Sequence, residues 1–284
     1  MKTQLKEALK GAIRYSIGTG GRTRVGRYIF KQILSTSMEE CREVEHDGVR
    51  LRFAAPNELC NWRAQTFSTK EPETLAWIDA IPEGSVVWDV GANIGLYSVY
   101  AARRRKCRVW AFEPSVFNLE LLARNVYLNG LVSQVCIVPF ALSTAVGSNQ
   151  LRMTTTEWGG ALSTFGEEYG WDGEAIRKVF EFQTMGLPMD AACDVFGIPQ
   201  PEFIKMDVDG IEHLILAGGT SVLKAVKEVL IEVNDDFRDQ AEGCERLLKA
   251  AGLNMKHKLH SDMIESSTTG FQNTYNQIWV REQP

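Results

Sequence analysis

The sequence predicts an α/β protein built on one doubly wound, mostly parallel sheet with helices on both faces. Three observations predict this fold. From about residue 86 onward, short apolar runs alternate with helical patterns, which is typical of parallel sheets. A glycine-rich turn joins the first apolar run to the helix that follows it. The composition, 44% hydrophobic and 24% charged over 284 residues, suits one such domain with an N-terminal extension.

Seven strands are expected, each a short apolar run bounded by polar or turn residues. They cover residues 86–90, 108–112, 134–140, 203–206, 228–233, 255–259 and 275–280. Helices are expected over 96–105, 118–128, 221–225 and 244–251, and Asn129-Gly130 ends the second of them. Ligands of such sheets bind at the carboxyl ends of the strands, where the strand order reverses. The sequence therefore places the chemistry at the ends of the first two strands.

Residues 143–202 interrupt this alternation. The segment contains Gly159-Gly160 and four large aromatic residues, Trp158, Phe165, Tyr169 and Trp171. Long insertions over the strand ends often shape a substrate site. The alternative is a covering hairpin with a small aromatic core of its own, and the sequence leaves both interpretations open.

The net charge of −5 is unevenly distributed along the chain. Residues 1–31 carry eight basic side chains and one acidic one, a net charge of +7, which leaves −12 for the rest. Four basic residues recur every four positions and share one helix face, with an apolar stripe beside them. The basic set is Lys2, Lys6, Lys10 and Arg14, and the apolar set is Leu5, Leu9, Ala12 and Ile13.

This pattern predicts a basic helical extension over residues 1–69, with the main domain over 70–284. The extension is interpreted either as an interfacial helix on anionic lipid or as a solvated helix that docks on the acidic body or on a second subunit. We favour docking, which leaves a homo-oligomer open. A nucleic-acid partner is not expected, because the main domain is acidic and nothing else extends the basic patch.

Membrane-spanning and secreted proteins are disfavoured. No stretch approaches the roughly 20 consecutive apolar residues that span a bilayer, and no continuous apolar segment follows the basic N-terminus as in a secretory signal. Six cysteines are scattered without close pairs, which indicates reduced structural thiols in a cytoplasmic protein. They are Cys41, Cys60, Cys107, Cys136, Cys193 and Cys244.

The strongest functional pattern runs from Val86 to Ser98, where a strand, a glycine-rich turn and a helix follow one another. Gly91 and Gly95 permit a tight turn and close approach of a ligand to the backbone. The free amides at the helix start then receive an anionic group, and Asp89 is available for an ammonium group. The spacing is G-x-N-x-G, which differs from the dinucleotide pattern G-x-G-x-x-G.

Glu113 stands at the carboxyl end of the second strand, 24 residues after Asp89. An acid at this place accepts hydrogen bonds from both hydroxyl groups of a ribose. The alternative is a charge at a helix start, since Pro114-Ser115 is typical of a helix entry. The glycine turn upstream favours the ribose role.

Taken together, the motifs resemble the FkbM family of class I methyltransferases. They are E-P-E-T at 71–74, D-V-G-A-N-I-G at 89–95, A-F-E-P at 111–114, N-x-x-L-L-x-x-N at 118–125 and K-M-D-V-D-G-I-E at 205–212. The resemblance covers about residues 70–235 and keeps the expected order. It implies a Rossmann-like class I fold, S-adenosylmethionine as cofactor with S-adenosylhomocysteine as product, and methylation of hydroxyl groups, often on sugars.

Carried over by position, the resemblance implies a role for each part of the motifs. The methionine end of the cofactor falls to Asp89, Gly91, Asn93 and Gly95, with Glu71 closing over it. The ribose falls to Glu113, with Asn118 close by, and the adenine is flanked by Ala141, Leu142 and Ser143. Asp209 departs from the family, which more often has Glu there, and keeps the charge on a shorter side chain.

Methylation of a hydroxyl group is helped by a base that takes its proton. The candidate catalytic residues are Asp207, Asp209, His213 and Glu232. Asp207, at a strand end, is also expected to lie near the cofactor methyl group, whereas Glu212 is interpreted as a helix-start charge. A magnesium site using Glu232, Asn234 and Asp235 together with Asp207 or Asp209 is the alternative to the metal-free site that we favour.

The expected function is therefore O-methylation, most often of a sugar hydroxyl, with a small molecule or glycan as acceptor. Two rival functions remain at this point. One is a methyltransferase-like scaffold that binds its cofactor or a partner without turnover. The other is a nucleotide-dependent oxidoreductase, which the absence of a third glycine in the turn disfavours.

Overall fold

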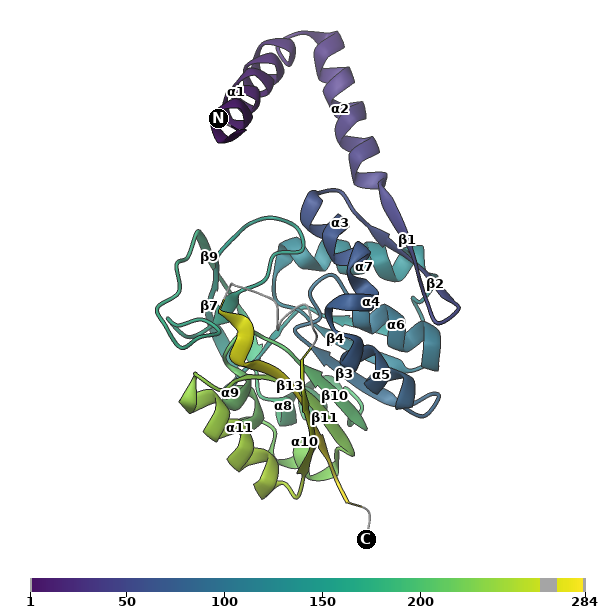
Figure 1. Ribbon diagram of the computed structural model, residues 1–284, viewed down its shortest axis with the longest axis vertical. Coiled ribbons are helices and arrows are strands. Elements are labelled where there is room, and N and C mark those ends of the chain that lie inside the picture. The colour runs from purple at the N-terminus through teal and green to yellow at the C-terminus, as the bar shows by residue number, and fades with distance from the viewer. Residues whose placement is uncertain (1, 261–269, 283–284) are drawn as a thin grey trace.

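The computed structural model describes residues 2–260 and 270–282, apart from the side chains of residues 2, 3 and 6. Its centre is a seven-stranded sheet in the order β12-β13-β11-β10-β3-β4-β5, in which the five strands from β11 to β5 run parallel and β13 and β12 are antiparallel (Figure 1). The strand bounds are β3 Val86–Val90, β4 Arg108–Phe112, β5 Val135–Val138, β10 Phe203–Met206, β11 Glu228–Asn234, β12 Asn254–Leu259 and β13 Thr274–Val280. The expected α/β class and the seven strands are confirmed.

Both faces of the sheet are covered, because all five residues of β3 are buried and alternate between two cores. Trp88 packs with one core and its neighbour Val87 with the other. The Trp88 core draws on α8 Met189–Phe196, α9 Glu212–Ala217, α10 Thr220–Ala225 and α11 Arg238–Ala250. The Val87 core draws on α5 Pro72–Ala80, α6 Leu96–Arg105 and α7 Val116–Leu128.

The inserted region forms a second, four-stranded sheet in the order β6-β9-β7-β8. Its strands are β6 Ala141–Leu142, β7 Gly147–Met153, β8 Ser163–Phe165 and β9 Phe180–Leu187. Leu151 and Phe165 of this sheet are buried in the same core as Trp88, so the insertion is a covering sheet. The two residues also line a cavity of about 540 Å³, so the insertion packs on the sheet and borders this cavity as well.

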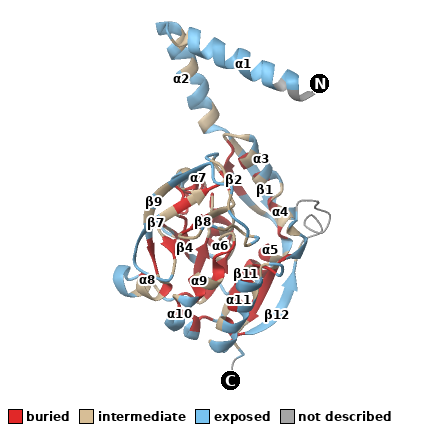
Figure 2. Cartoon of the chain, turned by 90° about the vertical axis from the view of Figure 1, so that its left-hand side faces the viewer, coloured by how far each residue is buried: buried red, intermediate tan, exposed pale blue. Residues whose placement is uncertain are grey.

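The N-terminal region differs from the helical extension expected over residues 1–69. Only α1 Lys2–Gly20 and α2 Arg24–Glu39 project from the body, as Figures 1 and 2 show. A hairpin of β1 Cys41–His46 and β2 Val49–Ala54 follows, and then α3 Glu58–Gln65 and α4 Phe67–Lys70. Phe53 and Phe67 are buried in the Val87 core, so residues from 41 onward pack as part of the domain.

The hairpin follows from a local turn sequence that the prediction of a continuous helical extension did not take into account. Asp47 and Gly48 form its two-residue loop, and both have positive φ, 44° and 77°. An Asp-Gly pair between alternating apolar residues is the preferred sequence for such a turn. Within the described residues, none of the helices combines the length and the apolar character needed to cross a bilayer.

Candidate active site

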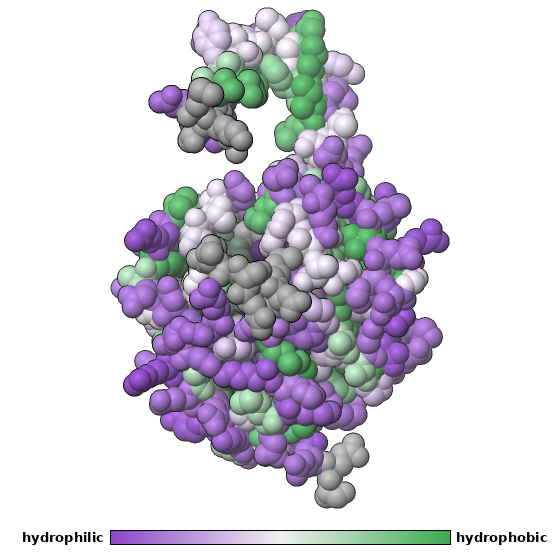
Figure 3. All heavy atoms as spheres, in the orientation of Figure 1, coloured by the Kyte–Doolittle hydropathy of each residue, from purple (hydrophilic) through white to green (hydrophobic). Residues whose placement is uncertain are grey.

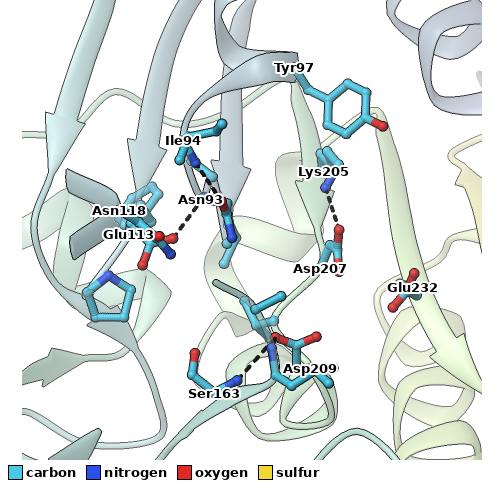
Figure 4. Close-up of a pocket in the computed structure, with 18 of the residues that line it drawn as sticks. Asn93, Ile94, Tyr97, Glu113, Asn118, Ser163, Lys205, Asp207, Asp209 and Glu232 are labelled. Atoms are coloured by element: carbon cyan, nitrogen blue, oxygen red, sulfur yellow. Dashed lines mark hydrogen bonds and ion pairs between the residues drawn. The ribbon is translucent and has the colours of Figure 1, made fainter. Parts of the chain in front are cut away.

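A cavity of about 540 Å³ opens at the carboxyl ends of β3, β4 and β10. The chain leaves β3 toward β4 on one side and returns to β10 on the other, so the strand order reverses at this place. Ten of its lining residues carry the argument below: Glu71, Gly91, Asn93, Glu113, Asn118, Ala141, Lys205, Asp207, Asp209 and Glu232. Figure 4 shows most of these side chains around one space.

The turn after β3 depends on two glycines that no other residue replaces. At Gly91, with φ of 83°, a Cβ atom would lie 1.9 Å from the carbonyl oxygen of Asp207. At Gly95, with φ of 81°, it would lie 2.2 Å from a methyl carbon of Leu122. The turn therefore packs directly against the end of β10 and against α7, which fixes the start of α6 beside the cavity.

Glu113 reaches from the end of β4 to the same turn. Its carboxylate accepts hydrogen bonds from the backbone N–H groups of Asn93 and Ser115, each at 2.8 Å. Burial raises the pKa of Glu113 to about 7. A carboxylate offers about four acceptor positions, so two backbone donors leave capacity for hydroxyl groups in the cavity. The helix-start role is present as well, since Ser115 precedes α7.

Asp89 lies beneath the cavity wall and is 3% exposed. Its Oδ2 accepts a hydrogen bond of 2.5 Å from the Ser98 hydroxyl. Its Oδ1 is buried and has no hydrogen-bond partner among the described residues. A buried carboxylate oxygen without a donor is rare in folded proteins, so this atom fits a cationic ligand group such as an ammonium.

A cluster of opposite charges closes one side of the cavity. Lys70 Nζ lies 2.5 Å from Glu71 Oε1, and Lys205 Nζ lies 3.0 Å from Asp207 Oδ2. Although burial opposes the change, Lys70 and Lys205 lower the pKa of Glu71 to about 2. Lys205 also stands over the ring of Tyr97, 5.1 Å from its centroid. These contacts hold the ammonium of Lys205 charged and fixed at the end of β10.

Asp209 connects the sheet to the inserted region. Its Oδ2 accepts from the backbone N–H groups of Leu162 at 2.7 Å and Ser163 at 3.3 Å (Figure 4). Burial and the charge of Asp207 raise the pKa of Asp209 to about 6. The residue has φ of 63°, a left-handed conformation that non-glycine residues seldom adopt. Such strain is typical of functional positions.

Glu232 lies beside Asp207, on the neighbouring strand β11 near its end (Figure 4). Burial, followed by the charges of Asp207 and Glu71, raises the pKa of Glu232 well above its usual value. Three of the four expected catalytic side chains, those of Asp207, Asp209 and Glu232, therefore lie around the same cavity.

His213, the fourth expected catalytic residue, does not line the cavity. Its ring packs edge-on against Phe237, with centroids 6.0 Å apart, and burial lowers its pKa. Ile211 and Ile215 of the same segment line the cavity instead, because a side chain two positions away on a helix faces another direction. The prediction of His213 as a base is corrected accordingly.

Gly95 and Ser143 differ in position from their expected roles, because neither lines the cavity, whereas Glu212 stands in the first turn of α9 as expected. The hydroxyl of Ser143 donates to the carbonyl oxygen of Ala145 at 2.9 Å. Ala141 and Leu142 do line it, next to Phe140. Glu212 is buried and accepts from the backbone N–H groups of Val208 and Gly210, each at 3.0 Å, so it closes the loop after β10.

Of the oxygen ligands considered for magnesium, Glu232 lines the cavity and Asn234 and Asp235 do not. The one set of three acidic or imidazole groups whose ligand atoms fall within 4.8 Å of each other is His46, Asp47 and Asp79, and none of them lines the cavity. Asp235 instead forms an ion pair with Lys258 at 2.5 Å.

Several cavity residues were not foreseen. Lys205 lies within the K-M-D motif, so its place in the pattern was a signal for it. Trp62, Arg63 and Lys70 come from α3 and α4, and Phe271 from a single helical turn ahead of β13. No local motif marks these four, because tertiary packing alone brings their elements to the strand ends.

Known proteins match a large part of this chain. The family described as "Methyltransferase FkbM domain" matches residues 89–266. The hexuronic acid methyltransferase AglP of Haloferax volcanii is 24% identical over 190 residues, 67% of this chain and 73% of that protein. The methyltransferase sdnD of Sordaria araneosa is 32% identical over 159 residues, 49% of this chain and 61% of that protein.

Solved structures with a similar fold are more distant. Fibrillarin of Aeropyrum pernix, in complex with natively bound S-adenosyl-L-methionine, has a TM-score of 0.46 at 10% identity, covering 86% of this chain and 84% of that one. A precorrin-6y C5,15-methyltransferase of Geobacter metallireducens has a TM-score of 0.44 at 13% identity, covering 75% and 87%.

Proposed function

This chain belongs to the FkbM family of methyltransferases, and from that premise we propose that it methylates a hydroxyl group of an acidic sugar. Membership makes it an S-adenosylmethionine-dependent methyltransferase, which sets aside the oxidoreductase and the non-catalytic scaffold. The observation that carries the finer proposal is Arg63 at the cavity, where only its Nε is engaged by a described partner and the rest of the guanidinium can face an anionic group.

The residues of the cavity suit the cofactor. When bound, S-adenosylmethionine supplies a methyl group on a positively charged sulfur, which an acceptor oxygen takes up while the carbon–sulfur bond breaks and its electron pair stays on sulfur. Asp89 Oδ1, buried and without a donor among the described residues, would receive the ammonium group. Glu113 would accept from the ribose hydroxyls, and the amides at the start of α6 would hold the carboxylate.

Asp209 is the proposed general base for the acceptor hydroxyl. With a pKa of about 6, its carboxyl group is mostly ionised at neutral pH, yet it is basic enough to take a proton in the transition state. Asp207 is neutralised by Lys205 at 3.0 Å, which suits a positioning role. Burial raises the pKa of Glu232, which favours the protonated form that can donate a hydrogen bond to the acceptor.

The acceptor side of the cavity supports a sugar. Trp62, which is 40% exposed, and Phe271, whose ring stacks with one face on Trp171, offer aromatic surface at the cavity, against which the apolar face of a sugar ring can pack. The Nε–H group of Arg63 donates a hydrogen bond to the carbonyl oxygen of Gly159 at 2.8 Å. The terminal nitrogens of the guanidinium can therefore donate to an anion. A relative named for a hexuronic acid agrees with a carboxylate-bearing sugar at this place.

The test is a methyltransfer assay with purified protein, S-adenosylmethionine and matched pairs of glycosides that carry either a glucuronic acid or a glucose end. We expect S-adenosylhomocysteine to be released with the uronic acid member of a pair and far less with the neutral member. Arg63→Met, which keeps much of the side-chain volume, should erase this preference. Equal rates with both members, or a preference that survives in Arg63→Met, would contradict the acidic-sugar proposal while leaving the family's activity in place.

A further inference from the structure

The two N-terminal helices, called here the basic arm (residues 2–39), extend away from the body in Figures 1 and 2. None of the described side chains of α2 is buried, and those of α1 are exposed along its length. The basic arm holds ten of the 22 large apolar residues that are exposed in the described chain. They are Leu5, Leu9, Ile13, Tyr15, Ile17, Val25, Tyr28, Ile29, Ile33 and Leu34.

These apolar residues are periodic, so each helix is amphipathic. Leu5, Leu9, Ile13 and Ile17 recur every four residues along α1, with Lys10 and Arg14 each one position beyond a stripe residue. Figure 3 shows the resulting hydrophobic side chains gathered along the arm.

The second helix repeats this arrangement. Val25, Ile29 and Ile33 also recur every four residues. The cations Arg24, Arg27 and Lys31 share the opposite, polar face of α2, and all are exposed.

Specific contacts fix the turn between α1 and α2. A Cβ atom on Gly26 would lie 2.0 Å from the carbonyl oxygen of Gly20, so only glycine permits the helices to approach this closely. Thr23 caps α2, its hydroxyl accepting from the Gly26 N–H at 2.9 Å. Phe30 packs over Gly20. Two amphipathic helices are thus held together while their apolar faces stay uncovered.

We propose that the basic arm binds the surface of an anionic phospholipid bilayer. Helices with a large apolar stripe flanked by Lys and Arg lie in the plane of the headgroups, with the stripe in the acyl boundary and the cations on lipid phosphates. The charge of the arm suits this partner, because its described acidic side chains are only Glu7, which pairs with Lys10 at 2.8 Å, and Glu39.

A second copy of this chain fits less well. Pairing of two basic arms would bring like charges together, which costs free energy at close range. Docking of the arm on another copy's body would need an apolar surface of matching size. The remaining exposed apolar residues of the described chain are spread over several elements, among them Tyr127 on α7, Val146 before β7 and Val195 on α8.

The test is co-sedimentation of the full chain with phosphatidylcholine vesicles prepared with and without phosphatidylglycerol. We expect binding only to the anionic vesicles, weakened by high salt. Arg24→Gln with Arg27→Gln should lower the partition coefficient by about fivefold for each charge removed. Leu9→Glu with Ile13→Glu should lower it by more than about tenfold. The matched control is Val132→Glu with Val146→Glu on the body, both exposed, which should leave it unchanged.

Binding of S-adenosylhomocysteine, measured by calorimetry, should be the same in all variants and shows that each is folded. Failure of the wild-type chain to sediment with anionic vesicles would overturn the proposal, as would vesicle binding that the Leu9 and Ile13 variant retains. A dimer found by light scattering without lipid and lost in that variant, with no vesicle binding, would assign the face to a second copy instead.

Discussion

Among the single residues of the site, Glu113 joins the cofactor pocket to the turn that forms it. Its two backbone hydrogen bonds require acceptors on both carboxyl oxygens. Glu113→Gln places an amide N–H₂ against one backbone donor and removes the charge, so we expect affinity for S-adenosylhomocysteine to fall by about 1–3 kcal/mol. Calorimetric titration measures this loss. In the wild type, affinity should also rise with pH through about 7, the pKa of Glu113, because the ionised form is the better acceptor.

The matched control is Glu120→Gln on α7, which removes a carboxylate whose partner is Arg124 at 2.7 Å and which does not line the cavity. Its affinity should equal that of the wild type. If Glu113→Gln binds with unchanged affinity and keeps the pH dependence, Glu113 is not the ribose acceptor.

The proposed role of Asp209 as the general base predicts how its substitution changes kcat. Asp209→Asn keeps a carbonyl oxygen to accept from Leu162 and Ser163 but cannot take a proton. We expect kcat to fall about 100-fold or more while cofactor affinity is kept. At saturating cofactor, the wild-type rate should rise with pH through a pKa of about 6 and then level off, since the base acts in its ionised form, and the variant should lose this rise.

Asp194→Asn, on the exposed side of α8, is the control and should keep the wild-type profile. A rise near pH 6 that persists in Asp209→Asn would show that another group supplies the base, and Asp207 and Glu232 would be next to test.

At the scale of elements, four predicted segments have the same bounds in the structure: β3, α6, β4 and β10. The bounds of each element can be predicted from the sequence because an apolar run or a helical pattern ends at a turn residue, as the apolar run of β3 ends at Gly91. The hairpin β1–β2 was missed although Asp47-Gly48 signals it, since the basic helical pattern before it was extended too far. The wall formed by Trp62 and Arg63 could not be predicted, because only packing of α3 against the domain brings them to the cavity.

The turn after β3 is the element on which site and fold both depend. Gly91→Ala adds a Cβ atom 1.9 Å from a backbone oxygen at φ of 83°, so either β3 or β10 has to shift. We expect the free energy of unfolding to fall by more than about 3 kcal/mol and cofactor binding to be lost. Chemical denaturation and calorimetry measure the two effects.

Gly84→Ala is the control that separates the backbone strain of a positive φ from the steric clash expected in Gly91→Ala. Gly84 has φ of 79°, yet a Cβ atom there meets nothing within 4 Å, so only the conformational cost of about 1 kcal/mol remains. Equal destabilisation by both substitutions would mean that the contact between the turn and the end of β10 is not what makes Gly91 necessary.

Over the whole molecule, the sheet forms a rigid frame, whereas the buried carboxyl groups of the site lower the free energy of unfolding when they are ionised. Five buried or cavity-lining carboxyl groups have a raised pKa, in each case chiefly through burial: Asp89, Glu113, Asp209, Glu212 and Glu232. Charged groups in such places oppose folding. The ionised acids of the site therefore reduce the stability of the fold, which is typical of residues that serve a function.

This arrangement predicts how stability depends on pH. An acid whose pKa is higher in the folded than in the unfolded state binds more protons when folded, so its contribution is present below the unfolded pKa and is lost as the pH rises through the folded value. For Glu113 and Glu212 these limits are about 4.5 and about 7. The free energy of unfolding should then fall between about pH 5 and about pH 7.5, on the order of 3 kcal/mol for each group.

Urea denaturation of the protein without cofactor, followed by fluorescence at both pH values, measures this change. His213 opposes it in the same range, because burial lowers the pKa of its ring and an uncharged buried histidine favours folding as pH rises. His213→Gln should therefore steepen the fall, and Glu212→Gln should reduce it. A free energy of unfolding that is equal or higher at the upper pH, in the wild type and in His213→Gln alike, would mean that the carboxyl groups are ionised in the folded protein and that the cavity is wetter than its burial indicates.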